Sequence, residues 1–420
     1  MSEFKNELHQ QIIFYQNQPS FLDVILGKKK AAIQEKKIVI FGAGVLGKQA
    51  ALAFKHTGVI IDRFIDNNSE KWNLEYKGIK CQSPESLSED ARDCFVLISP
   101  ATDTSKIVAQ LKNIGLTEDQ ILWNQEQRVK FGNSYYYYLA NCLCSMLSSI
   151  QNPFEIINRD IEEISRIHKH LADEKSKKIF LSKLALTCAG ENFGALNNYL
   201  ENHSDTIIEN RMKFGNDATN HFPNPEFEYY FRQDFLAFSD DEIYVDVGAA
   251  DGDTIKPFLT EMLCRKKTIK KIYAFEPDPF SFQELEKNLK AFSFIEPHRI
   301  GVTQETGTTR FSPMTERDLK LCGTLSESGE VDIPCISIDN FFSTREAPTL
   351  IKLDPGGDII PGIIKGAEET IIKSRPKIIA GAYHSVESIY RVPEILLRKN
   401  YKVYLRHLAY HANETHAFAI

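Results

Sequence analysis

The chain has 420 residues and carries 50 basic and 57 acidic side chains, for a formal net charge of −7. This charge excludes the broad basic surface that non-specific nucleic-acid binding requires, so we expect no nucleic-acid partner. Hydrophobic residues make up 42% and charged residues 25%, which is typical of a folded protein and excludes a disordered or collagenous chain. At about 150 residues per domain, the length predicts two or three domains.

The cysteines and the first residues bear on the cellular compartment. No two cysteines form a CxxC pair or a metal-like array with histidines, which favours reduced, buried thiols over a disulfide framework. The chain starts with acid and amide side chains, where a signal peptide would have a basic start and an apolar run. The uncharged stretch Ser134–Ile150 is at the short limit for a membrane span and predicts a buried or interfacial helix. We therefore expect a cytoplasmic protein without a membrane span.

The first half of the chain predicts a helical segment followed by an α/β domain. Residues 1–35 are amphipathic and helical in pattern, and residues 36–126 alternate strands with helices. The expected elements of this domain are Lys37–Phe41, Gly47–His56, Val59–Ile65, Cys94–Ile98 and Thr104–Ile114. Because strand and helix alternate, we expect a parallel, Rossmann-like sheet.

The second half predicts helices and then another α/β domain. Residues 127–235 lose the strand pattern and show helical periodicity in Ile156–Leu171 and Lys175–Ala189, which indicates a helical connector. Alternation resumes over residues 236–420, with strand candidates at Glu242–Val247, Lys271–Phe275, Thr349–Leu353 and Lys377–Ala382. The expected fold class is α/β, with two Rossmann-like doubly wound sheets joined by a helical connector.

A glycine-rich turn follows the first strand of the N-terminal domain. Gly42, Gly44 and Gly47 fit the pattern GxGxxG, and Asp66 stands at the expected end of the next strand. In a nucleotide site such glycines permit a tight turn, close approach of a pyrophosphate and helix packing, while the acid accepts from ribose hydroxyls. Two interpretations stay open, a weak nucleotide or nucleotide-sugar site, and a turn that the sheet needs without any ligand. At the level of fold, the module resembles nucleotide-binding-like domains found beside sugar-modifying enzymes.

A second glycine-rich turn, DVGAADGDT at residues 246–254, gives the strongest chemical signal. Its glycines are interleaved with carboxylates, which would repel a pyrophosphate but suit a cationic, amino-acid-bearing ligand such as S-adenosylmethionine. Asp246 and Asp251 would then face the ammonium group, and Glu276 would accept from both ribose hydroxyls. The alternative is a turn whose acids face solvent. The candidate cofactor-binding residues are Asp246, Gly248, Ala249, Asp251, Gly252, Asp253, Thr254, Glu276, Pro277 and Asp278.

Several motifs in the C-terminal half occur in an order that is similar to the FkbM-type methyltransferases. They are DVGAADGDT at 246–254, FEPDP at 275–279 followed by a helix with Leu285 and Asn288, SIDNF at 337–341, IKLD at 351–354, KGAEETI at 365–371, AYH at 382–384 and LRH at 405–407. The resemblance spans about residues 240–420. It implies a seven-stranded class I methyltransferase sheet closed by an antiparallel hairpin, for which Lys402–Arg406 and His416–Ile420 are the candidates.

The resemblance also implies binding of S-adenosylmethionine at the carboxyl ends of the strands. The implied reaction is methyl transfer to oxygen, usually a hydroxyl of a sugar, a glycan or another natural product. One departure from the family pattern stands out, because the acid-rich segment D-[IV]-E-G-x-E is Asp354-Pro355-Gly356-Gly357-Asp358-Ile359 here. Both glutamates are missing. The enzyme would then be impaired, altered in substrate, or dependent on Asp358.

Two residues are candidates for the base that takes the proton from the acceptor hydroxyl. His384 is the first, because it follows a strand where substrate-facing residues emerge and has a suitable pKa. Asp354 is the second. A structural role for His384 is the alternative, and for His407 a structural role is preferred. Arg391 and Arg406 are candidate contacts for an anionic acceptor, although solvated arginines are commoner.

The histidines His407, His411 and His416 raise the question of a metal site. In a strand-and-loop segment their spacing does not place the rings on one face, and no zinc-type cysteine pair accompanies them. We therefore expect no metal.

The sequence thus favours an S-adenosylmethionine-dependent O-methyltransferase with a small-molecule or glycan acceptor, and it allows a homo-oligomer. A catalytically degenerate scaffold in a carbohydrate-modification complex is the second hypothesis, motivated by the departure at residues 355–358. A nicotinamide-dependent oxidoreductase or epimerase is the third, and it is disfavoured because the N-terminal turn has no catalytic partner for a nicotinamide.

Overall fold

The computed structural model describes most of both α/β domains and of the helices between them. The described residues are 2–26, 31, 36–56, 58–99, 104–122, 152–189, 192–205, 208, 230–313, 324–325, 329–409 and 413–420. The expected helix Ser134–Ile150 and the side chain of His411 lie outside these residues. Within them, no helix has the length and apolar character needed to cross a membrane.

The N-terminal domain is built on a six-stranded sheet of order β3-β4-β2-β1-β5-β6. Its strands are β1 (Lys37–Phe41), β2 (Ile61–Ile65), β3 (Glu75–Tyr76), β4 (Ile79–Gln82), β5 (Cys94–Ile98) and β6 (Ile121–Leu122). Its helices are α3 (Val45–His56) and α4 (Ser105–Ile114), with short 3-10 turns at Ser69–Lys71, Pro84–Glu89, Ala91–Asp93 and Glu118–Gln120. Every pairing is parallel except that of β3 with β4. Strands β1, β2 and β5 are short apolar runs buried in the core, as is typical of a parallel sheet. The expected parallel sheet is confirmed.

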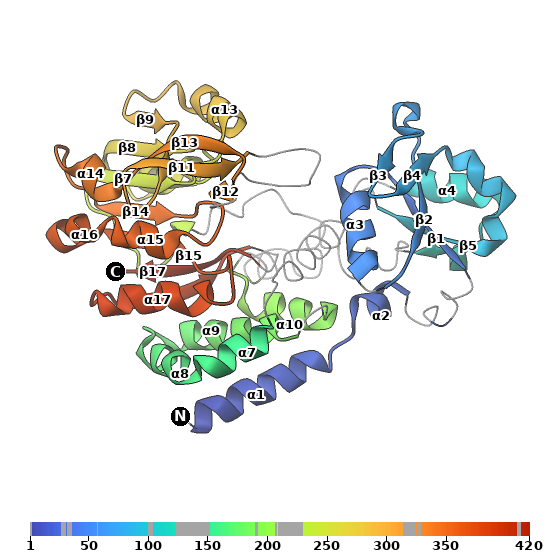
Figure 1. Ribbon diagram of the computed structural model, residues 1–420, viewed down its shortest axis with the longest axis horizontal. Coiled ribbons are helices and arrows are strands. Elements are labelled where there is room, and N and C mark those ends of the chain that lie inside the picture. Colours follow the sequence, from blue (N-terminus) through green and yellow to red (C-terminus); the bar gives the residue numbers. More distant parts are fainter. Residues whose placement is uncertain are drawn as a thin grey trace.

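A layer of helices joins the two α/β domains, and it includes the first helices of the chain (Figure 1). Its members are α1 (Ser2–Gln16), α2 (Phe21–Leu26), α7 (Pro153–Arg159), α8 (Ile161–His170), α9 (Glu174–Thr187) and α10 (Phe193–His203). Helix α1 packs against α8, α9 and α10, and Asn192 donates a side-chain hydrogen bond to the carbonyl of Gln18 at 2.5 Å. The helical periodicity expected over Ile156–Leu171 is confirmed, and the structure divides this stretch at Asp160, which ends α7 and begins α8.

The C-terminal domain contains the expected seven-stranded sheet, of order β16-β17-β15-β14-β7-β8-β9. Its strands are β7 (Glu242–Val247), β8 (Ile269–Phe275), β9 (Ile295–His298), β14 (Leu350–Leu353), β15 (Lys377–Gly381), β16 (Val403–His407) and β17 (Thr415–Ala419). Its helices are α12 (Ile255–Cys264), α13 (Pro279–Leu289), α14 (Ile338–Phe342), α15 (Ile360–Lys365), α16 (Glu368–Ser374) and α17 (Ser388–Arg398). Strand β17 is antiparallel to both of its neighbours, so the expected closing hairpin is confirmed.

A small four-stranded sheet, which the sequence did not predict, covers part of the C-terminal domain. Its order is β10-β13-β11-β12, and its strands are β10 (Gly301–Val302), β11 (Gly307–Ser312), β12 (Thr324–Leu325) and β13 (Val331–Ile336). Two of the strands have only two residues, and β11 and β13 are largely exposed, so they lack the buried apolar run that marks a strand in the sequence.

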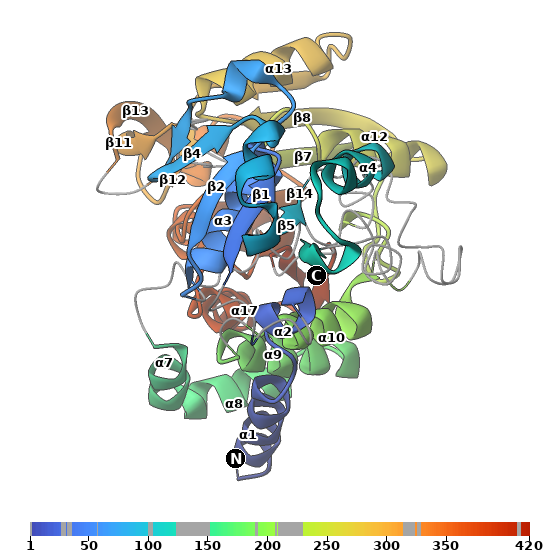
Figure 2. The ribbon, with the colours of Figure 1, turned by 90° about the vertical axis from the view of Figure 1, so that its right-hand side faces the viewer.

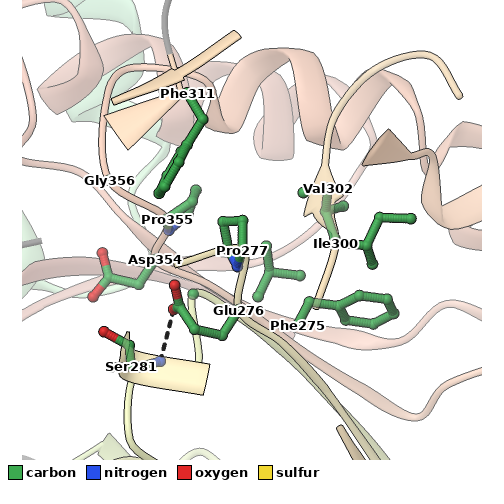
Figure 3. Close-up of a pocket in the computed structure, with 14 residues that line it drawn as sticks. Phe275, Glu276, Pro277, Ser281, Ile300, Val302, Phe311, Asp354, Pro355 and Gly356 are labelled. Atoms are coloured by element: carbon green, nitrogen blue, oxygen red, sulfur yellow. Dashed lines mark hydrogen bonds between the residues drawn. The ribbon is translucent and has the colours of Figure 1, made fainter. Parts of the chain in front are cut away.

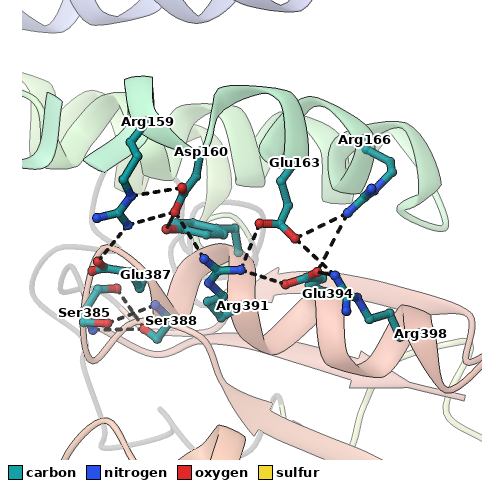
Figure 4. Close-up of polar contacts among 11 residues, drawn as sticks. Arg159, Asp160, Glu163, Arg166, Ser385, Glu387, Ser388, Arg391, Glu394 and Arg398 are labelled. Carbon is teal, nitrogen blue, oxygen red and sulfur yellow. Dashed lines mark hydrogen bonds and ion pairs between the residues drawn. The ribbon is translucent and has the colours of Figure 1, made fainter. Parts of the chain in front are cut away.

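Charged side chains fasten the helical layer to α17 of the C-terminal domain (Figure 4). Arg391 pairs with Glu163 at 2.8 Å and with Asp160 at 3.3 Å, and it also reaches Glu394 at 3.2 Å. Arg398 pairs with both glutamates. In the view of Figure 2, α7, α8, α9 and α10 lie together below the two sheets, as they do in Figure 1. The layer is therefore part of the C-terminal half of the molecule.

Candidate functional site

The carboxyl ends of β7, β8 and β14 meet at one edge of the C-terminal sheet, and a cavity opens there (Figure 3). These strands are parallel neighbours, so the loops that follow them are brought together. The cavity is lined by Val247, Gly248, Ala250, Phe275, Glu276, Pro277, Ser281, Ile300, Gly301, Val302, Phe311, Asp354, Pro355 and Gly356. Of the predicted site residues, Gly248, Glu276, Pro277 and Asp354 line it.

Glu276 is held in the cavity by two backbone amides. Its Oε2 atom accepts from Ala250 at 2.9 Å and its Oε1 atom from Asp278 at 2.9 Å. Burial raises the pKa of this carboxyl to about 7, even though both amides favour the ionised form. The carboxylate is thus fixed in place, and no basic side chain among the described residues forms an ion pair with it.

Gly248 lets the loop after β7 approach the loop after β14. It has φ 77°, a left-handed conformation that favours glycine, and a Cβ atom at this position would lie 2.4 Å from the carbonyl oxygen of Asp354. The two loops touch here, and only a residue without a side chain fits between them. The glycine therefore shapes the wall of the cavity between Glu276 and Asp354.

Asp246 does not line the cavity, in contrast to the expected contact with a ligand ammonium group. Strands β7 and β14 pair with Asp246 opposite Lys352, whose ammonium lies 3.1 Å from the carboxylate and donates to the carbonyl of Gly248 at 2.9 Å. The hydroxyls of Thr254 and Tyr244 also donate to Asp246, at 2.6 and 2.9 Å. Burial alone would lower the pKa of Lys352, but Asp246 and other acids outweigh it and raise that pKa. The ion pair between Asp246 and Lys352 thus supports the glycine-rich turn after β7 and does not face the cavity.

Other predicted cofactor residues have structural partners as well. Asp278 caps α13 by accepting from Phe280 and Ser281 at 3.0 and 3.1 Å, and Asp253 accepts from the amide of Thr254 at 2.7 Å. The Asp251 side chain is exposed, while its carbonyl accepts from Asn288. The predicted residues that do not line this cavity are Asp246, Ala249, Asp251, Gly252, Asp253, Thr254, Asp278 and His384.

Asp354 joins the cavity to a buried polar cluster. Its Oδ1 atom accepts from the Tyr383 hydroxyl at 2.7 Å and lies 3.3 Å from Nε2 of His384, and its Oδ2 atom lies 3.4 Å from Nε2 of His416. Gly381 leaves room for this, because a Cβ atom there would lie 2.6 Å from Oδ1. Burial would raise the pKa of Asp354, but the two imidazoles and the charge of Lys352 hold it well below its usual range.

The remaining candidates from the sequence lie away from the cavity. His407 is buried, and its Nδ1 atom is 2.8 Å from the Thr415 hydroxyl. Arg391 belongs to the ion pairs of α17, and Arg406 pairs with Asp173 at 2.7 Å, so both arginines bind carboxylates of the helical layer. Asp358 accepts from the Ser385 hydroxyl at 2.7 Å.

Sequence reasoning missed the apolar wall of the cavity. Ile300 and Val302 come from the loop after β9 and from β10, and Phe311 comes from β11 of the small sheet. Figure 3 shows Phe311 across the cavity from Glu276. No local pattern marks these residues, because each is a single apolar side chain in a short strand or loop.

The turn after β1 of the N-terminal domain has the geometry that its glycines predict. Gly42 has φ 103°, and a Cβ atom on Gly47 would lie 1.8 Å from the carbonyl oxygen of Gly42, so helix α3 packs directly on the turn. A Cβ atom on Gly44 would have no neighbour within 4 Å. Two of the three glycines are therefore needed by the fold itself.

The side chain of Asp66 binds groups of the N-terminal domain itself, close to this first turn. Its Oδ2 atom accepts from the amide of Ala43 at 2.8 Å and from the ammonium of Lys71 at 2.9 Å, and its Oδ1 atom accepts from the amide of Asn68 at 2.9 Å. Burial opposes its ionisation, but these partners outweigh it and lower the pKa of Asp66. The contact with ribose hydroxyls expected for Asp66 stays a prediction.

Two family models match the chain. Residues 34–122 match C2185-like, N-terminal, and residues 246–403 match the Methyltransferase FkbM domain. The first match covers most of the N-terminal domain and does not bear on a nucleotide ligand, so the nucleotide site expected from its glycines stays a prediction. A comparison with curated proteins gave no match.

Solved structures extend the likeness to the whole chain. Methyltransferase FkbM from Methylobacillus flagellatus KT is 19% identical with a TM-score of 0.59, and the match covers 98% of this chain and 99% of that one. UDP-D-quinovosamine 4-dehydrogenase from Vibrio fischeri is 26% identical over 20% of this chain and 74% of that one, with a TM-score of 0.18. Fibrillarin from Aeropyrum pernix is 10% identical over 46% of this chain and 73% of that one, with a TM-score of 0.31. Residues 246–403 are thus similar to the Methyltransferase FkbM domain, and the fold of the chain is similar to that of the Methylobacillus protein.

Proposed function

We propose that the protein is an S-adenosylmethionine-dependent O-methyltransferase whose acceptor is a hydroxyl of a sugar, a glycan or a related small molecule. The observation that carries this proposal is Glu276, a carboxylate held by two amides inside the cavity at the strand ends. Two carboxylate oxygens in this fixed position can each accept from one hydroxyl of a ribose.

The rest of the cavity suits the other parts of this cofactor. Ile300, Val302 and Phe311 offer an apolar wall for an adenine ring, while Gly248 and Asp354 lie on the opposite side, near the β7 turn. The pKa of Asp354 is lowered, and among the described residues its nearest basic groups are the two imidazoles, so the carboxylate favours the positive charge of a sulfonium or ammonium group. Asp246 would act indirectly, by holding Lys352 beneath the turn.

Methyl transfer mainly requires alignment of three atoms and removal of one proton. The acceptor oxygen attacks the methyl carbon, the carbon–sulfur bond breaks toward S-adenosylhomocysteine, and the hydroxyl proton passes to a base. His384 lies 3.3 Å from Asp354, which lines the cavity, and this carboxylate can orient the imidazole and stabilise it once it is protonated. In this proposal His384 is the base and Asp354 positions it.

Calorimetric titration with S-adenosylhomocysteine tests the cofactor site. The unchanged protein should bind one equivalent, and Glu276→Gln should weaken binding at least about 100-fold, because one charged acceptor of two hydrogen bonds is lost. The matched control is Asp66→Asn, which removes the equivalent acid of the N-terminal turn and should leave the affinity unchanged. No heat with the unchanged protein, or equal affinity in Glu276→Gln, would refute the proposal.

The scaffold hypothesis predicts cofactor binding without turnover. Its motive is the loss of two glutamates after Asp354, and the structure places Pro355 and Gly356 from that segment in the cavity wall. Asp354 itself is retained beside His384, which favours a working enzyme. Transfer of a labelled methyl group from the cofactor to any member of a panel of sugar hydroxyls, lost in His384→Gln, separates the two hypotheses.

A further inference from the structure

A second group of side chains converges behind Asp354, outside the wall of the cofactor cavity. It consists of Asp354, Glu414, His416 and Tyr230, which come from the loop after β14, the start of the hairpin strand β17 and the segment before β7. His416 and Tyr230 are fully buried, and the side chains of Asp354 and Glu414 are 9% and 14% exposed. Two carboxylates and an imidazole thus meet away from solvent.

The spacing of the four donor atoms is that of ligands around one ion. The Tyr230 hydroxyl lies 3.2 Å from Asp354 Oδ2, 2.5 Å from Glu414 Oε2 and 2.8 Å from His416 Nε2. The imidazole nitrogen lies 3.4 Å from the Asp354 oxygen and 3.7 Å from the Glu414 oxygen. Ligands bound tetrahedrally at about 2.0–2.1 Å are about 3.3 Å apart, which is close to the two distances between the imidazole and the carboxylates. One ligand atom each of Asp354, Glu414 and His416 lies within 4.8 Å of the others, and the shorter contacts of the Tyr230 hydroxyl would lengthen around an ion.

The charges and hydrogen bonds of these side chains also favour a bound cation. A tyrosine hydroxyl has one proton to donate, yet the Tyr230 hydroxyl is within bonding distance of two carboxylates and an imidazole. Lys352, whose charge acts on Asp354, is bound to Asp246 and to the carbonyl of Gly248 instead. The carboxylates of Asp354 and Glu414 lie close together and to His416, and a cation between them would add to the positive charge that the imidazoles and Lys352 provide.

We propose that Asp354, Glu414, His416 and Tyr230 bind a divalent transition-metal ion. Oxygen ligands mixed with an imidazole suit Mn²⁺, Fe²⁺, Co²⁺ or Zn²⁺ better than Mg²⁺ or Ca²⁺, which prefer oxygen alone. Nε2 of His384 lies 3.3 Å from Asp354 Oδ1, the carboxylate oxygen that does not face His416. The expectation of no metal was based on the spacing of His407, His411 and His416 and on the lack of a cysteine pair, and it did not consider the carboxylates. His407 has a different partner, the hydroxyl of Thr415.

The role of the ion rests on the proposed function. Asp354 offers Oδ2 to the metal site and Oδ1 to the side of His384, so the site borders the place where an acceptor must meet the methyl group. An ion there would bind the acceptor oxygen and lower its pKa. The methyl carbon would then exchange its bond to sulfur for a bond to the acceptor oxygen, and the hydroxyl proton would pass to the base proposed above, His384.

Titration of the full-length, chelator-treated protein with Co²⁺ alone tests the site, because cobalt absorbs visible light strongly when it has four or five ligands. We expect saturation at one equivalent, without the near-ultraviolet band of a cobalt–thiolate bond. Glu414→Gln and His416→Gln should each weaken Co²⁺ binding at least about 10-fold. The matched control is Glu296→Gln, since Glu296 pairs with His298 at 3.2 Å without a second carboxylate ligand, and its Co²⁺ affinity should equal that of the unchanged protein.

The result on the unchanged protein decides the proposal even if a variant is unstable. Absence of saturable Co²⁺ binding, or equal affinity in Glu414→Gln, would overturn the metal site. Glu414 does not line the cofactor cavity, so Glu414→Gln should bind S-adenosylhomocysteine as the unchanged protein does. If the unchanged protein binds S-adenosylhomocysteine but not Co²⁺, the metal site is rejected and the proposed function stands. If it does not bind S-adenosylhomocysteine, the proposed function is rejected.

Discussion

The two glycine-rich turns of the chain share one local geometry and differ in charge. In the N-terminal domain Asp66 accepts from the amide of Ala43 at 2.8 Å, and in the C-terminal domain Glu276 accepts from the amide of Ala250 at 2.9 Å. Each acid also accepts from the amide two residues downstream of itself, at 2.9 Å in both cases. In both domains a carboxylate at the end of the second strand ties down the turn after the first.

The difference lies in what neutralises the carboxylate. The ammonium of Lys71 is 2.9 Å from Asp66, whose pKa is lowered, whereas burial without such a partner raises the pKa of Glu276 to about 7. One acid is satisfied by its own domain, and the other keeps the capacity to accept from a ligand. The comparison teaches that a glycine-rich turn followed by an acid locates a loop, while the charge partner of the acid separates a structural turn from a binding turn.

Removal of the lysine beneath the C-terminal turn should have the largest effect. Lys352→Met leaves Asp246 as an unpaired charge in the core, and we expect the free energy of unfolding of the C-terminal half to fall by about 3–5 kcal/mol. Urea denaturation followed by far-ultraviolet circular dichroism measures the loss. Of the two tryptophans of the chain, Trp72 lies in the N-terminal domain and Trp123 follows β6 of that domain directly in the sequence, so we expect their fluorescence to report mainly on the N-terminal domain. A loss below 1 kcal/mol would contradict the pairing.

The glycines give a matched pair of substitutions. Gly248→Ala places a Cβ atom 2.4 Å from a backbone carbonyl at a positive φ, whereas Gly44→Ala meets nothing within 4 Å. We expect about 2–4 kcal/mol of destabilisation and loss of S-adenosylhomocysteine binding for the first, and a change within about 0.5 kcal/mol for the second. Equal effects in the two denaturation experiments would erase the proposed difference between the turns.

The pH dependence of stability should have opposite signs at the two acids. Folded Glu276 keeps its proton up to about pH 7, but the unfolded chain loses it near the ordinary value of 4.5, so stability falls as pH rises between these values, by at most about 3 kcal/mol. Asp253, raised to about 7 by burial, acts in the same direction. Asp66 has a lowered pKa, and its contribution is lost as pH falls.

Denaturation of the unchanged protein and of Glu276→Gln at pH 5 and pH 7.5 isolates this contribution. The variant should lose part of the decrease, and the remainder should reflect Asp253. An identical pH dependence in both proteins would show that Glu276 is not a buried, unneutralised acid.

The smallest effect is expected at the lysine of the N-terminal turn. The side chain of Lys71 is 35% exposed, so its ion pair with Asp66 is screened, and Lys71→Met should cost no more than about 1 kcal/mol by tryptophan fluorescence. The same change should raise the pKa of Asp66 and make the two turns more alike. A loss comparable to that of Lys352→Met would mean that exposure does not distinguish the two lysines.

The fold could be predicted to the extent that buried strands are continuous apolar runs. Strands such as Cys94–Ile98 and Glu242–Val247 were placed at the observed residues for this reason. The small sheet could not be predicted, because Val331–Ile336 is mostly exposed and its partners are very short. The break at Asp160 was hidden as well, and the partners of its side chain on α17 are more than two hundred residues away in the sequence.

The site was predictable where its residues follow each other in the sequence. Glu276 and Gly248 stand at strand ends that a pattern can locate, and both line the cavity. The partner of Asp246 was missed because only the register between β7 and β14 places Lys352 opposite it. Tyr230 and Glu414 come to Asp354 from distant segments of the chain, so no spacing in the sequence predicts that these side chains form a cluster.

The position of α1 has a consequence for how this gene can be divided. Phe4, Leu8, Ile12 and Tyr15 are buried against helices that follow the N-terminal domain in the chain. The N-terminal α/β domain is therefore inserted, in the sequence, between two parts of the helical layer, and it is not a separate domain at one end of the chain. Trimming the coding sequence from its 5′ end would strip these side chains from the C-terminal half, whereas an internal excision with a short splice would keep both pieces of the layer together.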